Sequence, residues 1–153
     1  MVVTSFNSLN SLGDSWRKIE QQTNEIRRTE IAVVQSTVYI GGNIQVNVAN
    51  VGQIDFSKFS EWDIIAERQS GGTGRVKYID SLPGSNEWTI EGLYLSDNST
   101  VEIFDPGILN PGEVLKISIN LDPVMIVGET VRLSVTTPNG ITAQLQVTKI
   151  TPP

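Results

Sequence analysis

The sequence of 153 residues contains no histidine and no cysteine. Histidine is the side chain that most often moves protons near neutral pH, and cysteine supplies nucleophiles, disulfides and soft metal ligands. A Ser-His-Asp or Cys-His catalytic site is therefore excluded. Carboxylate pairs are the only plausible acid–base groups left, and none stands out along the sequence. We expect a protein that is not an enzyme and that holds no metal and no cofactor.

Long apolar runs and a basic face are also missing. No stretch reaches the roughly 18 consecutive apolar residues that span a bilayer. The net charge is −6, from 17 acidic and 11 basic residues. Up to Glu30 the charges cancel, so the excess negative charge lies in the rest of the chain. Binding to phosphate groups requires clustered Lys and Arg, and we therefore expect no nucleic-acid partner.

Residues 4–28 have the pattern of an amphipathic helix, with straight-chain and polar residues and no proline. Apolar residues recur at spacings of three and four. The helix seam, which we expect to contact a partner, consists of Leu9, Leu12, Trp16, Ile19 and Ile26. The full pattern is short and includes Ser5 and Thr23, so two interpretations stay open. The helix packs against its own domain or frays, or it contacts a neighbour in a bundle or filament.

From Glu30 onward the period changes to two, which is typical of half-buried strands. Turn signals such as Gly41-Gly42 and Pro138-Asn139-Gly140 separate the alternating segments. Strands are predicted over residues 30–39, 43–50, 59–68, 74–80, 86–95, 101–104, 113–121, 130–137 and 141–149.

Short strands at this spacing predict a mainly β fold. The expected architecture is an immunoglobulin-like β-sandwich of about 7–9 strands preceded by an N-terminal amphipathic α-helix. A closed barrel is the alternative. We expect residues 1–29 to form the helix, as the continuation of a missing apolar segment, and residues 30–153 to form the sandwich.

Two tryptophans of the β part raise the question of sugar binding, because aromatic rings stack on sugar rings. Trp62 lies in an apolar segment with Phe59 and Ile64 and is expected in the core. Trp88 follows a turn and is the better candidate for an exposed ligand-binding aromatic, although burial in the core is the simpler alternative. A carbohydrate-binding or adhesin-type module is accordingly the alternative function.

The segment 96–107 contains two further candidate sites. Asn98-Ser99-Thr100 is an acceptor sequence for N-glycosylation, which makes Asn98 a candidate glycosylation site. Asp97, Glu102 and Asp105 could ligate a hard cation through oxygen, but their spacing does not match the twelve-residue calcium loop. Acidic side chains of this kind more often face water.

Residues 14–31 (DSWRKIEQQTNEIRRTEI) and 46–67 (VNVANVGQIDFSKFSEWDIIAE) resemble archaeal flagellin-related proteins, including the stator-type accessory proteins of the archaeal flagellum. A weaker resemblance extends through residues 110–121 and 136–147. These proteins are similar to type IV pilins, with an apolar N-terminal helix, an amphipathic continuation and a β-sandwich head. The resemblance implies a non-enzymatic structural or interaction domain of an extracytoplasmic filament, either a flagellin-like or pilin-like subunit or a stator or anchor protein.

The resemblance also implies partners and a location. Like subunits or homologous filament proteins are the expected partners, and the cell-surface layer is a further candidate. The apolar helix of the family and its processing site do not occur in this sequence, so a membrane link is expected only through a segment absent from this chain. The expected location is extracytoplasmic, at the cell surface.

Overall fold

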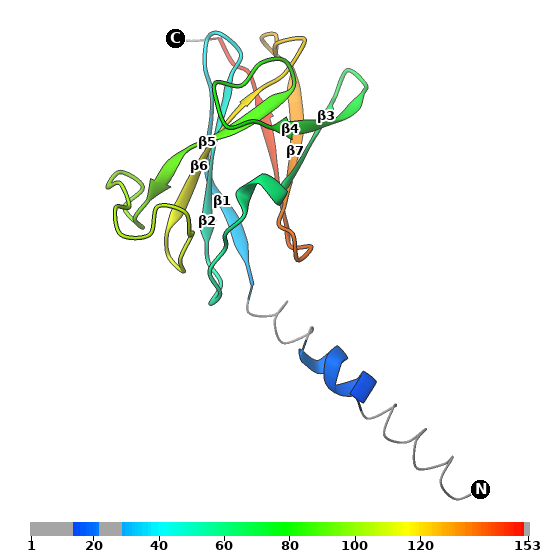
Figure 1. Cartoon of the computed structure of the whole chain (residues 1–153). Helices are drawn as coiled ribbons and strands as arrows, with labels where there is room; N and C mark the ends of the chain where they lie inside the picture. Colours follow the sequence, from blue (N-terminus) through cyan, green and yellow to red (C-terminus); the bar gives the residue numbers. More distant parts are fainter. Residues whose placement is uncertain (1–13, 22–28, 152–153) are drawn as a thin grey trace, which may run out of the picture.

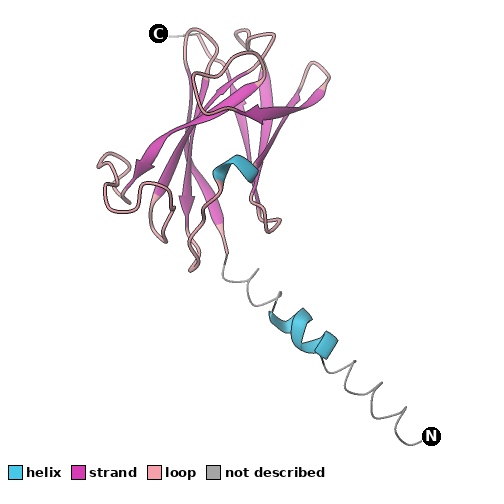
Figure 2. Ribbon diagram, in the orientation of Figure 1, coloured by secondary structure: helices cyan, strands magenta, loops and turns pink. Residues whose placement is uncertain are grey.

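The computed structural model describes residues 14–21 and 29–151. Residues 14–21 form a helix that lies outside the β structure, at the end where the first strand begins (Figure 1). The remaining described residues form a β-sandwich with loops at both ends (Figure 2). Within the described ranges, no helix is long and apolar enough to cross a membrane.

The described β part contains eight strands and one short 3₁₀ helix. In chain order they are β1 (Ile31–Val38), β2 (Ile44–Asn50), η1 (Phe59–Glu61), β3 (Asp63–Arg68), β4 (Thr73–Tyr78), β5 (Glu87–Tyr94), β6 (Val114–Asn120), β7 (Thr130–Thr136) and β8 (Thr142–Thr148).

The strands form two antiparallel sheets, in the orders β1-β2-β6-β5 and β4-β3-β7-β8. A short parallel pairing of β4 with β5 joins the sheets at one edge, and β1 lies beside β8 at the other. In immunoglobulin notation these orders are A-B-E-D and C′-C-F-G. The predicted immunoglobulin-like sandwich is confirmed, and its two joined edges make it nearly closed, which is the feature it shares with a barrel.

Alternating aliphatic side chains place the core between the two sheets. Each inward position pairs with another inward position across the ladder, as Val48 does with Leu115 and Ile64 with Val135. Fully buried members include Ile44, Val46, Val48, Ile64, Leu115, Ile117, Ile119, Val131, Leu133 and Val135. A register shift of one residue would turn these side chains to solvent, so the alternation fixes the pairing.

Two predicted strand segments are corrected. Residues 59–61 form η1 instead of the start of β3. In place of a strand at 101–104 there is an isolated bridge between Tyr94 and Val101. There the Glu102 carboxylate accepts the N–H groups of Phe104 and Asp105, which removes the donors that a strand ladder would use.

Both tryptophans of the β part belong to the core. Trp62 is 1% exposed and contacts Phe56 and Phe59 edge to face. Trp88 is 0% exposed and contacts the Tyr78 ring, with 4.9 Å between ring centroids. The hypothesis that Trp88 is an exposed sugar-binding aromatic is therefore wrong. The residue sits at an inward position of β5, opposite Ile119 of β6, and the alternation of that strand buries it.

Replacing Trp88 with Ala should lower the free energy of unfolding by about 3–5 kcal/mol, because it removes a large buried side chain and leaves a cavity. Trp16→Ala is the matched control, since Trp16 is 65% exposed on the helix, and we expect a change within about 0.5 kcal/mol. Urea unfolding followed by circular dichroism measures both. Equal effects of the two substitutions would contradict the assigned burial.

Candidate interaction surface

Exposed apolar side chains gather at the end of the sandwich opposite the start of β1. They come from the β1–β2 turn, from the β6–β7 loop and from the residue after Lys149. We call this surface the distal cap, and it consists of Tyr39, Ile40, Val124, Ile126, Val127 and Ile150, each 49–82% exposed. Soluble monomers rarely leave apolar patches uncovered unless they bind something.

The sequence of the β6–β7 loop explains why its apolar residues point outward. Residues 122–128 read DPVMIVG, so an uninterrupted apolar run lies between a proline and a glycine. The run lacks the polar residues that alternate with apolar ones in a half-buried strand. Gly128 has a φ of +87°, which glycine adopts without steric cost. Met125 is 0% exposed and anchors the loop in the core. Its neighbours Val124 and Ile126 are left on the surface.

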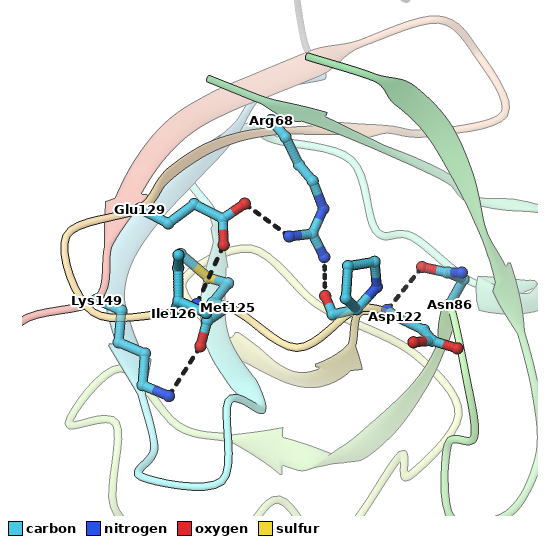
Figure 3. A network of polar contacts seen from close by, with 8 residues as sticks. Arg68, Asn86, Asp122, Met125, Ile126, Glu129 and Lys149 are labelled. Atoms are coloured by element: carbon cyan, nitrogen blue, oxygen red, sulfur yellow. Dashed lines mark hydrogen bonds and ion pairs between the residues drawn. The ribbon is translucent and has the colours of Figure 1, made fainter. Parts of the chain in front are cut away.

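A charged pair underlies this loop. The Arg68 guanidinium of β3 contacts the Glu129 carboxylate at 2.6 Å, and the two side chains are only 15% and 7% exposed. Arg68 also donates to the carbonyl of Pro123, and Glu129 accepts the N–H of Ile126 at 3.1 Å (Figure 3). The pair therefore fixes main-chain atoms on both sides of the exposed apolar residues.

Further contacts tie the loop to its neighbours. Lys149 Nζ donates to the carbonyls of Ile40 at 3.1 Å and Met125 at 2.9 Å, which links the β1–β2 turn to the β6–β7 loop. The turn approaches so closely that a Cβ on Gly42 would lie 2.9 Å from Val124 Cβ. On the other side, Asn86 Oδ1 accepts the N–H of Asp122 at 2.9 Å (Figure 3).

These contacts hold the main chain of the β1–β2 turn and the β6–β7 loop together. A groove of about 540 Å³ opens in it, lined among others by Arg68, Pro123, Val124, Ile126, Val127 and Glu129. Its positive and negative groups are paired with each other or bonded to main-chain carbonyls.

The helix seam lies mostly outside the described residues. Leu9, Leu12 and Ile26 belong to ranges that the structure does not describe. Trp16 and Ile19 lie on the helix of residues 14–21 and are 65% and 54% exposed. Two members of the seam are thus accessible, and its role as a contact stays a prediction.

Two acidic residues near position 100, Asp97 and Glu102, accept hydrogen bonds from main-chain N–H groups. Asp97 accepts hydrogen bonds from the Thr100 hydroxyl and from the N–H groups of Thr100 and Ser99, and these bonds lower the pKa of Asp97 to about 2. The Phe104 N–H likewise lowers the pKa of Glu102. Within the described residues, no group of three or more acidic side chains is placed to hold a metal ion. The carboxylates of Asp97 and Glu102 therefore hold turns of the main chain.

Asn98 is engaged in a network of side-chain amides. Its Nδ2 donates to Gln35 Oε1 at 3.0 Å, and its Oδ1 accepts from Asn47 Nδ2 at 3.2 Å. These bonds hold the loop after β5 against the outer face of β1 and β2. The nitrogen that a glycan would join is therefore already hydrogen-bonded in this structure.

No pattern interpreted above predicts the distal cap. An apolar run bounded by Pro123 and Gly128 was the available signal, since it lies in a loop yet has no polar alternation. The pairing of Arg68 with Glu129 spans 61 positions and leaves no local pattern.

No model of a protein family matches the sequence, and no curated protein matches it. Solved structures do match. The archaellum periplasmic stator protein FlaG from Sulfolobus acidocaldarius is 22% identical with a TM-score of 0.60, covering 78% of this chain and 99% of that chain. In the FlaF–FlaG complex from the same organism, the matching chain is 21% identical with a TM-score of 0.59, and the match covers 78% of this chain and 89% of that chain. The archaeal flagellum of Methanospirillum hungatei strain JF1 is 13% identical with a TM-score of 0.61, and the match covers 97% of this chain and 86% of that chain.

At these identities the likeness shows a shared fold. This chain has the β-sandwich fold of archaellum stator proteins and archaeal flagellar subunits. The resemblance to archaeal flagellin-related proteins seen in the sequence is confirmed at that level.

Replacing Arg68 with Ala should destabilise the protein by about 2–3 kcal/mol, because it leaves the nearly buried Glu129 carboxylate unpaired. Arg132→Ala is the control: its pair with Glu67 has both side chains 47% exposed, and we expect a loss within about 1 kcal/mol. Urea unfolding gives both values, and amide exchange at Ile126 should speed up only in Arg68→Ala. Similar losses for both variants would show that the pair does not fix the loop.

Proposed function

We propose that this chain is a non-enzymatic, extracytoplasmic structural protein of an archaellum or a related filament, and that its distal cap docks onto a homologous archaellum protein. The observation that carries the proposal is the distal cap itself. Ile40, Ile126 and Ile150 are 82%, 69% and 75% exposed on loops that a charged pair and Lys149 hold in place.

The chemistry of the cap favours a protein partner over a reactive ligand. Burial of its apolar side chains against a partner lowers the free energy by about 25 cal/mol per Å² of apolar area, before the costs of association. Of the charged groups beneath them, Arg68 and Glu129 are paired with each other and Lys149 donates to main-chain carbonyls. The proteins of shared fold support the direction of the proposal, since they include a periplasmic stator protein, a complex of FlaF with FlaG and a flagellum.

The helix seam is proposed as a second contact, directed to like subunits. Trp16 supports this proposal because a large aromatic ring that is 65% exposed on a short helix gains from being covered. Contact with the cell-surface layer, and a membrane link through a segment absent from this chain, are parts of the same proposal that follow from the sequence resemblance.

A carbohydrate-binding or adhesin function is not favoured. The aromatic residue proposed to stack on a sugar, Trp88, is fully buried, and the shared fold belongs to archaellum proteins.

Binding to purified archaellum sandwich domains encoded in the same genome tests the proposal. In biolayer interferometry we expect Ile126→Asp combined with Val127→Asp to weaken binding at least tenfold, because two carboxylates would be buried in an apolar contact. Trp16→Ser should leave this contact unchanged if the helix seam serves other neighbours.

Val34→Asp is the matched control, because Val34 is also apolar and 54% exposed but lies on β1, away from the distal cap. It should bind like the unmodified chain, and circular dichroism should show all variants folded. Absence of binding to every homologous domain, or equal loss with Val34→Asp, would refute the docking role of the distal cap.

Glycosylation of Asn98 stays a prediction. Mass spectrometry of peptides from native material should show a mass increment on the peptide that contains Asn98. An unmodified peptide would contradict the prediction and would agree with the hydrogen bond that Asn98 Nδ2 donates to Gln35.

A further inference from the structure

The first half of strand β4 is an open edge of the sandwich. On one side β4 pairs with β3 from Thr73 to Val76, but on the other side it pairs with β5 only at Lys77 and Tyr78. Because β5 begins at Glu87, no strand of the described chain lies beside the first half of β4. The tip of the β3–β4 hairpin projects there from the side of the sandwich (Figure 1). A further strand can therefore join the sheet at this edge.

Main-chain groups of Thr73 and Arg75 point toward the open side. In an antiparallel ladder, residues alternate between bonding to the partner strand and directing their N–H and C=O groups away from it. The Lys77 N–H is directed away from β3 and donates to the carbonyl of Asn86 at 3.0 Å. Thr73 and Arg75 alternate in step with Lys77, so their N–H and C=O groups also point away from β3. Both residues are exposed, and these groups are free to bond to an added strand.

A groove of about 320 Å³ lies beside this edge, lined among others by Ala66, Gly74 and Leu121. Ala66 of β3 pairs with Gly74 of β4, whereas the neighbouring inward pair is Ile64 with Val76. Two of the smallest residues thus occupy one rung of the ladder. A Cβ on Gly74 would meet no atom within 4 Å. The groove therefore has room for an apolar side chain supplied by an added strand.

The outer face of β4 is basic, since Arg75 and Lys77 are the only charged residues of this strand. Asp63 accepts from Arg75 Nε at 2.5 Å, yet the Arg75 side chain is 73% exposed, and the described chain makes no other contact with its guanidinium. Its terminal nitrogens can donate to a further carboxylate. Pairing of two β4 edges would bring like charges together, which is destabilising. Acidic side chains on an added strand would instead be attracted.

We propose that the open edge of β4 binds an extended acidic segment of another protein as an additional strand. The segment's main chain bonds to Thr73 and Arg75, one apolar side chain fills the groove beside Gly74, and carboxylates on its other face contact Arg75. Main-chain bonds supply affinity in such strand addition, and alternate side chains supply specificity. The groove shares Arg68 and Pro123 with the groove of the distal cap but uses none of the cap's exposed apolar residues, so this contact does not depend on the proposed function.

Titration of the isotope-labelled whole chain with a capped peptide of about eight alternating Glu and Val residues tests the proposal by NMR. We expect a Kd below about 1 mM, with shifts of the Thr73, Gly74 and Arg75 amides and slower exchange of the Thr73 and Arg75 N–H groups. A peptide of alternating Lys and Val should bind at least about tenfold more weakly, because its cations meet Arg75 and Lys77.

Variants separate the three parts of the contact. Gly74→Leu fills the groove, and Thr73→Pro removes an N–H that the β3 ladder does not use; each should weaken binding of the Glu–Val peptide at least about tenfold. Arg75→Ala should weaken it about fivefold. Arg132→Ala is the matched control, because it removes the same charge from the outer face of β7, where both neighbouring strands are paired, and it should bind like the unmodified chain.

Absence of amide shifts at Thr73 to Arg75 at about 5 mM peptide would overturn the proposal. So would equal binding of the two peptides, or unchanged binding by Gly74→Leu and Thr73→Pro when circular dichroism shows them folded. Ile126→Asp combined with Val127→Asp should bind the Glu–Val peptide within about twofold of the unmodified chain. A larger loss would assign the peptide to the distal cap and refute the edge site, whereas loss of homologue binding alone would refute only the proposed function.

Discussion

The structure depends on one constraint, the alternation of aliphatic and polar residues that turns a single face of each strand toward the opposite sheet. Val48 and Leu115 meet in one sheet, Ile64 and Val135 in the other, and all four are buried between them. Because the alternation has a period of two, it sets the register of every ladder as well as the composition of the core. The loops at both ends are free to vary around this frame.

At both ends of the sandwich, charged side chains fix the main chain of a loop. At the distal cap, the paired side chains of Arg68 and Glu129 hold a loop whose apolar side chains face water. At the opposite end, Glu102 holds Phe104 in the same way. In both places charged side chains bond to the main chain and leave apolar side chains outside. This inverts the usual distribution of polar and apolar groups, and it is the reason we propose the distal cap as a contact surface.

The fold could be predicted because its determinants are local. Period-two segments and glycine or proline turns located β1 to β8, and the sandwich followed from their number and spacing. The candidate site could not be predicted in the same way. Arg68 and Glu129 are 61 positions apart, so their pairing depends on the β3–β7 ladder and not on sequence neighbours. The strand expected at 101–104 failed because Glu102 bonds to its own main chain, which a hydropathy pattern does not register. The sequence left Trp88 open between the core and a ligand-binding surface because it follows a turn and its neighbours Glu87 and Thr89 are polar, although polar neighbours are what an inward position in β5 requires.

The direction of β1 has a mechanical consequence. This strand runs from the end near the N-terminal helix to the distal cap and pairs with β2 from Ile31↔Asn50 to Val38↔Ile44. Ladder hydrogen bonds lie perpendicular to their strands. Tension between the helix and a partner held at the cap would therefore load these bonds in shear, all together, instead of unzipping them singly. Resistance to such a load is set by the rate of unfolding, so the domain can transmit force even with ordinary equilibrium stability.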